Sequence, residues 1–444
     1  MKSVRIGCGA GFSGDRLEPA VDLAEQGDLD YLVFECLSER TMALAHLDRS
    51  KNAEGGFDPL LAERMRAVLP ICRRNGTKII SNMGAANPRA AACEVIRIAR
   101  SLGLGGLRIA CITGDDVLGL IASTETSYAG HDELPAGWRD DLISANAYLG
   151  AEPIVQALHQ GADVVLTGRT ADPSLFLGAL AYEFSWGADN WQILGQGTLV
   201  GHLLECAGQL TGGYFADPGY KDVPELAQLG FPFADVASDG SATLSKLTGT
   251  GGLISRATCI EQLLYEVQDP AAYVTPDVTA DFSAVEIQPT GFNEIHVSRA
   301  TGGPRPAELK VSLGLWGGYF GEGQISYAGS NALARARLAQ SIVEERLAAA
   351  GLLELECALM GVNAIHGQAL SPPASEIHEV RLRVAGRARS MLDAEKIRRE
   401  VEALYVNGPA GGGGITGCAR RLVAVESILI PREAVQCHIH MEMA

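Results

Sequence analysis

The sequence predicts an α/β protein with two domains, residues 1–240 and 241–444. In the first, short apolar segments alternate with helical segments, a pattern typical of βαβ units and of a mostly parallel, Rossmann-like sheet with helices on both faces. Beyond Gly212-Gly213, short β-rich segments follow one another between glycines and prolines. This change predicts a C-terminal α+β domain with an antiparallel sheet, and we place the boundary between Gly230 and Gly252.

The first half contains five short apolar runs, each long enough for a buried strand and too short for a helix. They are Val4–Cys8, Tyr31–Glu35, Lys78–Ser81, Leu107–Ile112 and Asp163–Thr167. Helical segments lie between them: Leu17–Gln26, Asp58–Arg74, the segment that ends at Leu102, and Ile154–His159. The alternation predicts parallel strands joined by helices.

Polar residues occupy the carboxyl ends of these strands. Glu35, Asn82 and Asp115 end the second, third and fourth strands, and Arg169 and Asp172 follow the fifth. Because ligands bind at the carboxyl ends of parallel strands, we expect these five residues to form a catalytic site. The alternative is that such residues cap helices, and that Arg169 and Asp172 form an ion pair within their loop.

The loop after the first strand matches the dinucleotide fingerprint GxGxxG with Gly9, Gly11 and Gly14. Glu35 lies at about the sequence position where the ribose-binding acid of that fingerprint is expected. No second nucleotide-binding pattern accompanies it, so the match is weak. A turn whose backbone N–H groups bind another anion is favoured. We therefore expect no cofactor, other than CoA as part of a substrate.

The segment Ser123–Trp138 follows the fourth strand and is polar, with glycine and proline. Such a composition predicts a long loop. Its place in the chain would put it over the strand ends, as a lid.

We predict that the second half of the sequence forms short strands and two helices. They are a hairpin around Asp239-Gly240, β-rich segments Ala284–Gln288, Glu294–Arg299, Glu308–Trp316 and Gly321–Ala328, helix Asn331–Ala349, strands Glu354–Val362 and Glu376–Val384, helix Asp393–Leu404, and a final strand pair, Arg421–Ile430 and Val435–Met441. Such a run is typical of an antiparallel sheet with helices on it.

Between the last helix and the final strand pair lies the most glycine-dense stretch, which includes Gly411, Gly412, Gly413 and Gly414. A Walker loop follows a strand and precedes a helix, which is the opposite order. We interpret the stretch as a backbone cradle for a phosphate, a carboxylate or a thioester oxygen, with a structural role as the alternative. His438 and His440 share one face of a strand, but two exposed histidines are a commoner explanation than a metal site.

Composition narrows the function classes. The net charge is −17 and no long Lys/Arg run occurs, which argues against binding to nucleic acid or anionic membranes. Ten scattered cysteines without a CxxC pair indicate reduced thiols. No apolar run approaches the ~20 residues of a membrane span, and the N-terminus leads directly into a strand. We expect a cytoplasmic protein.

Five motifs together resemble those of the acyclic terpene utilisation (AtuA) family: IGCGAGFSGDR, LTGRTADPSLFLG, YEVQDPAAYVTPDV, GGYFGEGQISYAG and NGPAGGGGITG. The resemblance covers nearly the whole chain. It implies a role in acyl-CoA catabolism of branched acyclic terpenoids such as citronellol and geraniol, and it carries over no catalytic residues. Relatives carry, or are encoded beside, a small ferredoxin-like module. The chain ends at Ala444, so the resemblance implies that this module is a separate polypeptide.

Together these features predict an enzyme that acts on a CoA thioester or small organic acid by hydratase, lyase or isomerase chemistry. Glu35 or Asp172 would be the base, and Asn82 and Arg169 would polarise or anchor the substrate. The alternative is a non-catalytic subunit that binds an acyl-CoA or acts as a scaffold. We also expect a homo-oligomer with a small ferredoxin-like partner, because long apolar terminal strands at a sheet edge invite pairing.

Overall fold

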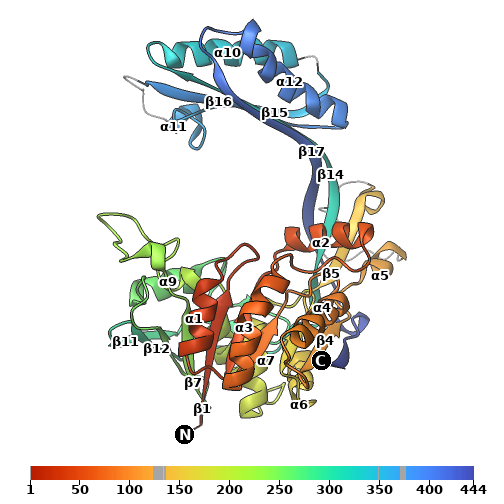
Figure 1. Ribbon diagram of the computed structural model, residues 1–444, viewed down its shortest axis with the longest axis vertical. Helices are drawn as coiled ribbons and strands as arrows, with labels where there is room; N and C mark the ends of the chain where they lie inside the picture. The colour runs from red at the N-terminus through yellow and green to blue at the C-terminus, as the bar shows by residue number, and fades with distance from the viewer. Residues whose placement is uncertain (1, 124–133, 135–136, 349, 371–376) are drawn as a thin grey trace. The chain divides into compact units, whose positions relative to one another are not determined.

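The computed structural model describes residues 2–123, 134, 137–348, 350–370 and 377–444 (Figure 1). Most of the predicted lid, residues 124–133 and 135–136, lies outside the described residues. The chain divides into unit 1, residues Met1–Gly314 and Val425–Ala444, and unit 2, residues Leu315–Ala424. The sequence placed the domain boundary near residue 240. Strands β7 (Pro232–Ala237) and β8 (Ala242–Lys246) pair on either side of that residue and form a hairpin within unit 1.

Within the described part of the chain, unit 1 has a ten-stranded mixed sheet, with the order β11-β12-β8-β7-β1-β2-β3-β6-β4-β18. Its parallel strands are β1 (Ser3–Ala10), β2 (Tyr31–Phe34), β3 (Lys78–Ser81), β6 (Val164–Leu166) and β4 (Arg108–Thr113). Antiparallel strands β7, β8, β12 (Glu294–Ser298) and β11 (Glu286–Gly291) extend one side, and β18 (His438–Met443) the other. The coarser prediction, a mixed α/β chain with parallel and antiparallel strands, is confirmed. The order β1-β2-β3-β6-β4 is not the 3-2-1-4-5-6 order of the Rossmann fold.

The helices of unit 1 pack in two groups. One group contains α1 (Glu18–Gln26), α3 (Leu61–Asn75) and α4 (Pro88–Ser101); the other contains α6 (Glu152–His159), α7 (Asp172–Phe184) and α8 (Trp191–Leu204). The connections from β1 to β2, β3 and β4 all run in one direction along the sheet. The connection from β4 to β6 runs in the opposite direction, because β6 lies between β3 and β4. Right-handed crossovers therefore place the two groups on opposite faces. Strand β2 is buried at all four positions, as expected for a parallel strand covered on both sides.

The remaining elements of unit 1 are α2 (Glu39–Lys51), α5 (Leu118–Ser123), β5 (Leu142–Ala147), α9 (Arg256–Leu264), β9 (Tyr273–Val274), β10 (Thr279–Asp281) and β13 (Thr301–Gly303). The last three form a small sheet of their own. Ser38 caps α2 by accepting a hydrogen bond from the Thr41 N–H, and Asn87 caps α4 in the same way. No helix among the described residues is long and apolar enough to cross a membrane.

Unit 2 follows the order β14 (Glu308–Ala328), α10 (Ala332–Leu347), β15 (Leu352–Met360), α11 (Gly367–Leu370), β16 (Glu379–Ala388), α12 (Met391–Asn407) and β17 (Gly413–Pro431). Its sheet has the order β15-β16-β14-β17, so each βαβ unit is split by a strand of the other. This is the ferredoxin-like arrangement. Helices α10 and α12 contact each other and β16, and therefore cover one face.

Two predictions about the C-terminal strands are corrected. The segments Glu308–Trp316 and Gly321–Ala328 form one strand, β14, whose first residues belong to unit 1 and pair with β5. The final strands β17 and β18 do not pair with each other. β18 instead returns to unit 1 and lies antiparallel to β4, at the edge of the large sheet.

Candidate functional site

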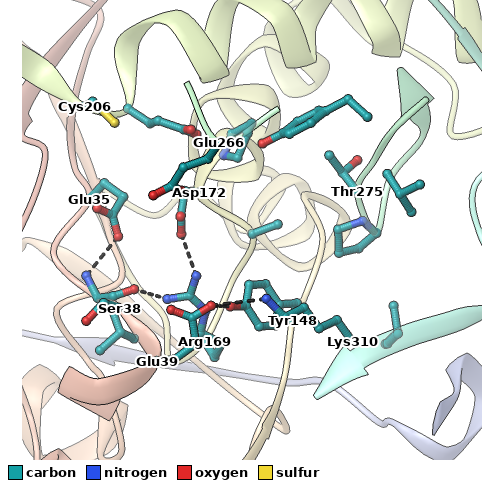
Figure 2. A pocket seen from close by; sticks show the side chains of 18 of the residues that line it. Glu35, Ser38, Glu39, Tyr148, Arg169, Asp172, Cys206, Glu266, Thr275 and Lys310 are labelled. Carbon is teal, nitrogen blue, oxygen red and sulfur yellow. Dashed lines mark hydrogen bonds and ion pairs between the residues drawn. The ribbon is translucent and has the colours of Figure 1, made fainter. Parts of the chain in front are cut away.

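The carboxyl ends of β1, β2 and β6 meet at a cavity with a volume of about 590 Å³ (Figure 2). Its lining includes residues 11–13 after β1, residues 35–39 after β2, and Arg169, Ala171 and Asp172 after β6. Residues from outside this series complete it: Tyr148, Glu205, Cys206, Tyr265, Glu266, residues 273–276, residues 306–310 and Leu429. All of these residues belong to unit 1. The cavity therefore lies where a parallel sheet is expected to bind a ligand.

The Glu35 side chain lines this cavity. Its Oε1 accepts hydrogen bonds from the Leu37 N–H and from Asn82 Nδ2, both at 2.9 Å. Burial, with the negative charge of Asp172, raises the pKa of Glu35 to about 8. At neutral pH the group therefore carries a proton. Since two donors already occupy Oε1, the proton belongs on Oε2.

Asn82 lies behind Glu35 rather than in the cavity wall. Its side chain is fully buried and, besides donating to Glu35, its Oδ1 accepts from the Cys36 N–H at 2.8 Å. The amide thus fixes both the carboxyl group and the start of the loop after β2. This arrangement makes Asn82 a positioning residue rather than a group that touches a ligand.

Arg169 joins two of the strand-end loops. Its Nη1 donates to the Leu37 carbonyl oxygen, and its Nη2 donates to Asp172 Oδ1 at 2.9 Å (Figure 2). The guanidinium also lies 4.2 Å from the centre of the Tyr148 ring. The ion pair offered as the alternative interpretation is therefore present, and it lines the cavity. Two of the five guanidinium N–H groups form these bonds, and Nε is buried without a hydrogen-bond partner among the described residues.

Asp115 is hydrogen-bonded to the backbone of the loop that contains Arg169. Its Oδ2 accepts from the Arg169 backbone N–H at 2.8 Å and from Asn146 Nδ2 at 2.9 Å. Burial raises the pKa of Asp115 to about 6, while these donors act to lower it. Asp115 does not line the cavity. A Cβ at Gly168 would lie 2.4 Å from its carboxylate, so this loop can approach only because residue 168 is glycine.

A second cluster, which sequence reasoning missed, contains Glu39, Tyr148 and Lys310. The Tyr148 hydroxyl donates to Glu39 Oε1, and Lys310 Nζ lies 3.2 Å from the same oxygen. Burial acts to raise the pKa of Glu39, but the Tyr148 hydrogen bond and the charges of Arg169 and Lys310 outweigh it and lower the pKa to about 2. The pairing of β5 with β14 brings Tyr148 and Lys310 together, and no local sequence pattern signals that pairing.

The sequence also did not single out Glu205 and His202. Glu205 lines the cavity, and its Oε1 lies 3.0 Å from His202 Nδ1. Burial, with the negative charges of Asp172 and Glu266, raises the pKa of Glu205 well above its ordinary value. Two buried glutamates therefore face one cavity.

A protein-family model, described as acyclic terpene utilisation family protein AtuA, matches residues 4–441. The chain belongs to the AtuA family. The match covers both units, so the ferredoxin-like unit is part of the family's sequence. A comparison with curated proteins finds no match, and a comparison with solved structures finds none either. Membership of AtuA suggests involvement in acyclic terpene utilisation.

In this AtuA chain, the glycines of the GxGxxG match serve close packing. Gly9 lies within β1, and a Cβ there would be 2.6 Å from the Phe34 ring. A Cβ at Gly11 would be 2.5 Å from the Cys206 backbone, and the Gly11 N–H already donates to Asp15 Oδ2 at 2.9 Å. Gly11 lines the cavity, but its N–H is engaged within the protein.

The glycine-dense stretch lies in unit 2, after α12 and into the start of β17 at Gly413, and contributes nothing to the cavity lining. Gly411 and Gly414 have positive φ values of 71° and 63°, which favour glycine. A Cβ at Gly412 would lie 2.8 Å from Ile325, whereas one at Gly413 would meet nothing within 4 Å. Packing and backbone conformation therefore explain three of the four glycines.

His438 and His440 lie on β18, and His440 is hydrogen-bonded within the protein. Arg89 Nη2 donates to His440 Nε2 at 2.9 Å, and the two imidazole rings are 6.5 Å apart. Throughout the described ranges, no three His, Cys, Asp or Glu side chains come together in a way that could hold a metal ion.

Proposed function

We propose that the chain is an enzyme that adds or removes water, or moves a double bond, in a CoA thioester or small organic acid. The observation that carries the proposal is that Glu35 and Asp172 both line one 590 Å³ cavity, where burial raises the pKa of Glu35 to about 8. Two carboxyl groups with different environments can serve as acid and base in the same reaction. The AtuA membership suggests acyclic terpenoids, and we propose their branched acyl-CoA derivatives as substrates.

In the dehydrating direction, Asp172 takes a proton from the carbon next to the acyl carbonyl. The C–O bond at the neighbouring carbon breaks, and Glu35 gives its Oε2 proton to the departing hydroxyl group, which leaves as water. Hydration runs the same steps in reverse. The ion pair with Arg169 holds the Asp172 carboxylate in place, while burial raises the pKa of Asp172 and makes it a stronger base than an exposed aspartate.

The lining also suits a branched hydrocarbon chain. Leu37, Pro173, Val274, Pro276 and Leu309 contribute apolar surface to the cavity. Polar residues are concentrated at the strand ends and near Lys310, so an acyl chain can be buried while its functional group meets the carboxyls. Apolar walls with a few converging polar groups are typical of small-molecule sites.

Mass spectrometry on a panel of branched enoyl- and hydroxyacyl-CoA thioesters and the corresponding free acids tests the proposal. We expect gain or loss of water, or deuterium uptake from D₂O. Glu35→Gln removes the transferable proton and should slow turnover by about 10²–10⁴-fold. Glu18→Gln is the matched control, because the Glu18 side chain is 74% exposed and does not line the cavity. Equal turnover in the two variants would contradict the role of Glu35.

The second candidate is a non-catalytic subunit that binds an acyl-CoA or acts as a scaffold for a partner enzyme. The link that Arg169 makes between Leu37 and Asp172 favours it, because such a link fixes the shape of a binding cavity without taking part in chemistry. Binding of CoA esters with no conversion, unchanged by Glu35→Gln and Asp172→Asn, would support this candidate.

We further propose that the chain works as a homo-oligomer and with a separate small ferredoxin-like partner. Strand β18 supports this, since it pairs with β4 and lies at the edge of the large sheet. An edge strand presents unpaired backbone groups that another chain can pair with. Light scattering coupled to size-exclusion chromatography should show more than one chain per particle, and a monomer that ignores the partner would contradict it.

A further inference from the structure

The hydrogen positions in the His202–Glu205 pair follow from its surroundings. His202 Nε2 lies 3.1 Å from the Leu263 carbonyl oxygen, which can only accept a hydrogen bond. Nε2 therefore carries a hydrogen. Tyr273 and Phe282 enclose the ring, with centroids 5.1 Å and 5.9 Å away. Burial among these groups lowers the pKa of His202 to about 4, so the imidazole is neutral at neutral pH.

A neutral imidazole with a hydrogen on Nε2 has a lone pair on Nδ1. The 3.0 Å contact between Nδ1 and Glu205 Oε1 therefore needs a hydrogen from Glu205. Glu205 is a carboxylic acid whose O–H is directed at His202, and its Oε2 is left as an acceptor. That oxygen is buried and has no hydrogen-bond partner in the described residues. A buried acceptor without a partner is costly, so a ligand or water group that donates to it is expected.

We propose that Glu205 is a fixed hydrogen-bond acceptor that selects substrates with a hydroxyl group at the reacting carbon. This inference rests on the proposed function and deepens it. Glu35, Asp172 and Glu205 all line the same cavity. Glu35 offers a proton from Oε2, and Glu205 offers an acceptor. A hydroxyl group both accepts and donates, so it satisfies both glutamates, and the substrate class is a hydroxy acid or its thioester.

The first test needs no ligand. Infrared spectra at a pH well above the pKa of Glu35 should retain the C=O band of a protonated carboxyl in the wild type and in Glu35→Gln. Glu205→Gln should remove that band. Loss of the band from the wild type itself would mean an ion pair between a charged His202 and an ionised Glu205, and would overturn the proposal.

The second test compares two substitutions at residue 205. Glu205→Gln keeps both contacts, because the amide N–H can donate to His202 Nδ1 and the amide oxygen can take the place of Oε2. Its Tm should stay within about 2 °C of the wild type. Glu205→Met has a similar length but no acceptor. A large fall in Tm for Glu205→Gln would indicate a lost ion pair and contradict the neutral pair.

The ligand probes are 3-hydroxy-3-methylbutanoate and 3-methylbutanoate, which differ by one hydroxyl group, and binding is measured by calorimetry. The wild type, Glu205→Gln and Glu35→Gln should prefer the hydroxy acid by roughly tenfold. Glu205→Met should bind the two acids equally. No preference in the wild type, a preference that survives in Glu205→Met, or binding of neither acid would overturn the inference. Turnover by Glu35→Gln, which tests the proposed function, is a separate measurement.

Discussion

The two units of this chain differ in what they bury. Among the described residues, every buried polar or charged side chain lies in unit 1, whereas the core of unit 2 contains apolar side chains and Tyr327. A buried charge costs free energy unless it is paired and hydrogen-bonded. Unit 1 retains such groups at the strand ends around the cavity, and perturbed groups in a cavity mark functional sites. No arginine side chain of unit 2 is among the buried residues of the described chain, and two of them, Arg383 and Arg387, pair with Glu322 and Glu354.

The largest expected difference is between the buried arginine of unit 1 and a surface arginine of unit 2. Arg169→Met removes two hydrogen bonds of a side chain that is only 2% exposed and leaves the Leu37 carbonyl oxygen and Asp172 without this donor, so it should lower the free energy of unfolding by about 2–4 kcal/mol. Arg383→Met, whose partner Glu322 is 2.8 Å away and whose side chain is 30% exposed, should cost at most about 1 kcal/mol. Urea unfolding measures both.

Equal losses of unfolding free energy in Arg169→Met and Arg383→Met would contradict the idea that the arginine of unit 1 contributes more to stability than that of unit 2. Arg169→Lys adds a finer test, because lysine keeps the charge but cannot reach Leu37 and Asp172 in the same geometry. A folded lysine variant with wild-type ligand binding would show that the link between these loops is unimportant for the site.

The second difference concerns pH. The folded-state pKa of Glu35, about 8, exceeds the ordinary value of 4.5. The proton is therefore held more tightly in the folded state, and its stabilising contribution is present in full below the unfolded pKa. It is lost as pH rises towards the folded pKa, by up to about 1.4 kcal/mol per pH unit. Glu35→Gln has no titratable proton at this position. Between pH 4.5 and about pH 8, its urea unfolding midpoint should therefore fall less steeply with pH than that of the wild type. Parallel curves would refute the raised pKa.

The sequence predicted the parallel strands because each is a continuous apolar run ended by a polar loop, which is a local signal. It did not predict the pairing of β5 with β14, or the return of β18 to β4, because these depend on contacts between distant segments. The same limit applies to β14, which was predicted as two segments, Glu308–Trp316 and Gly321–Ala328. The strand continues through the residues between them, with a φ of 88° at Gly318.

The candidate site shows a similar division. Glu35, Arg169 and Asp172 line the cavity, as their positions at strand ends suggested. Asn82 and Asp115 are in the expected loops, but a sequence pattern does not give side-chain direction, and both are buried behind the wall. Tyr148, Lys310 and Glu205 were missed because they come from elements outside the βα series.

The smallest expected effect is in the glycine-dense loop of unit 2. Gly413→Ala should change the free energy of unfolding by less than about 0.5 kcal/mol, because a Cβ there meets nothing within 4 Å and φ is not positive. Gly412→Ala places a Cβ 2.8 Å from Ile325 and 3.2 Å from Tyr327, and should cost about 1–3 kcal/mol. The pair separates packing from recognition. If Gly413→Ala leaves the Tm unchanged but weakens binding of an acyl-CoA or a partner chain, the loop approaches a ligand with its backbone. If binding is also unchanged, the loop serves unit 2 alone, and the chemistry of the chain belongs to unit 1.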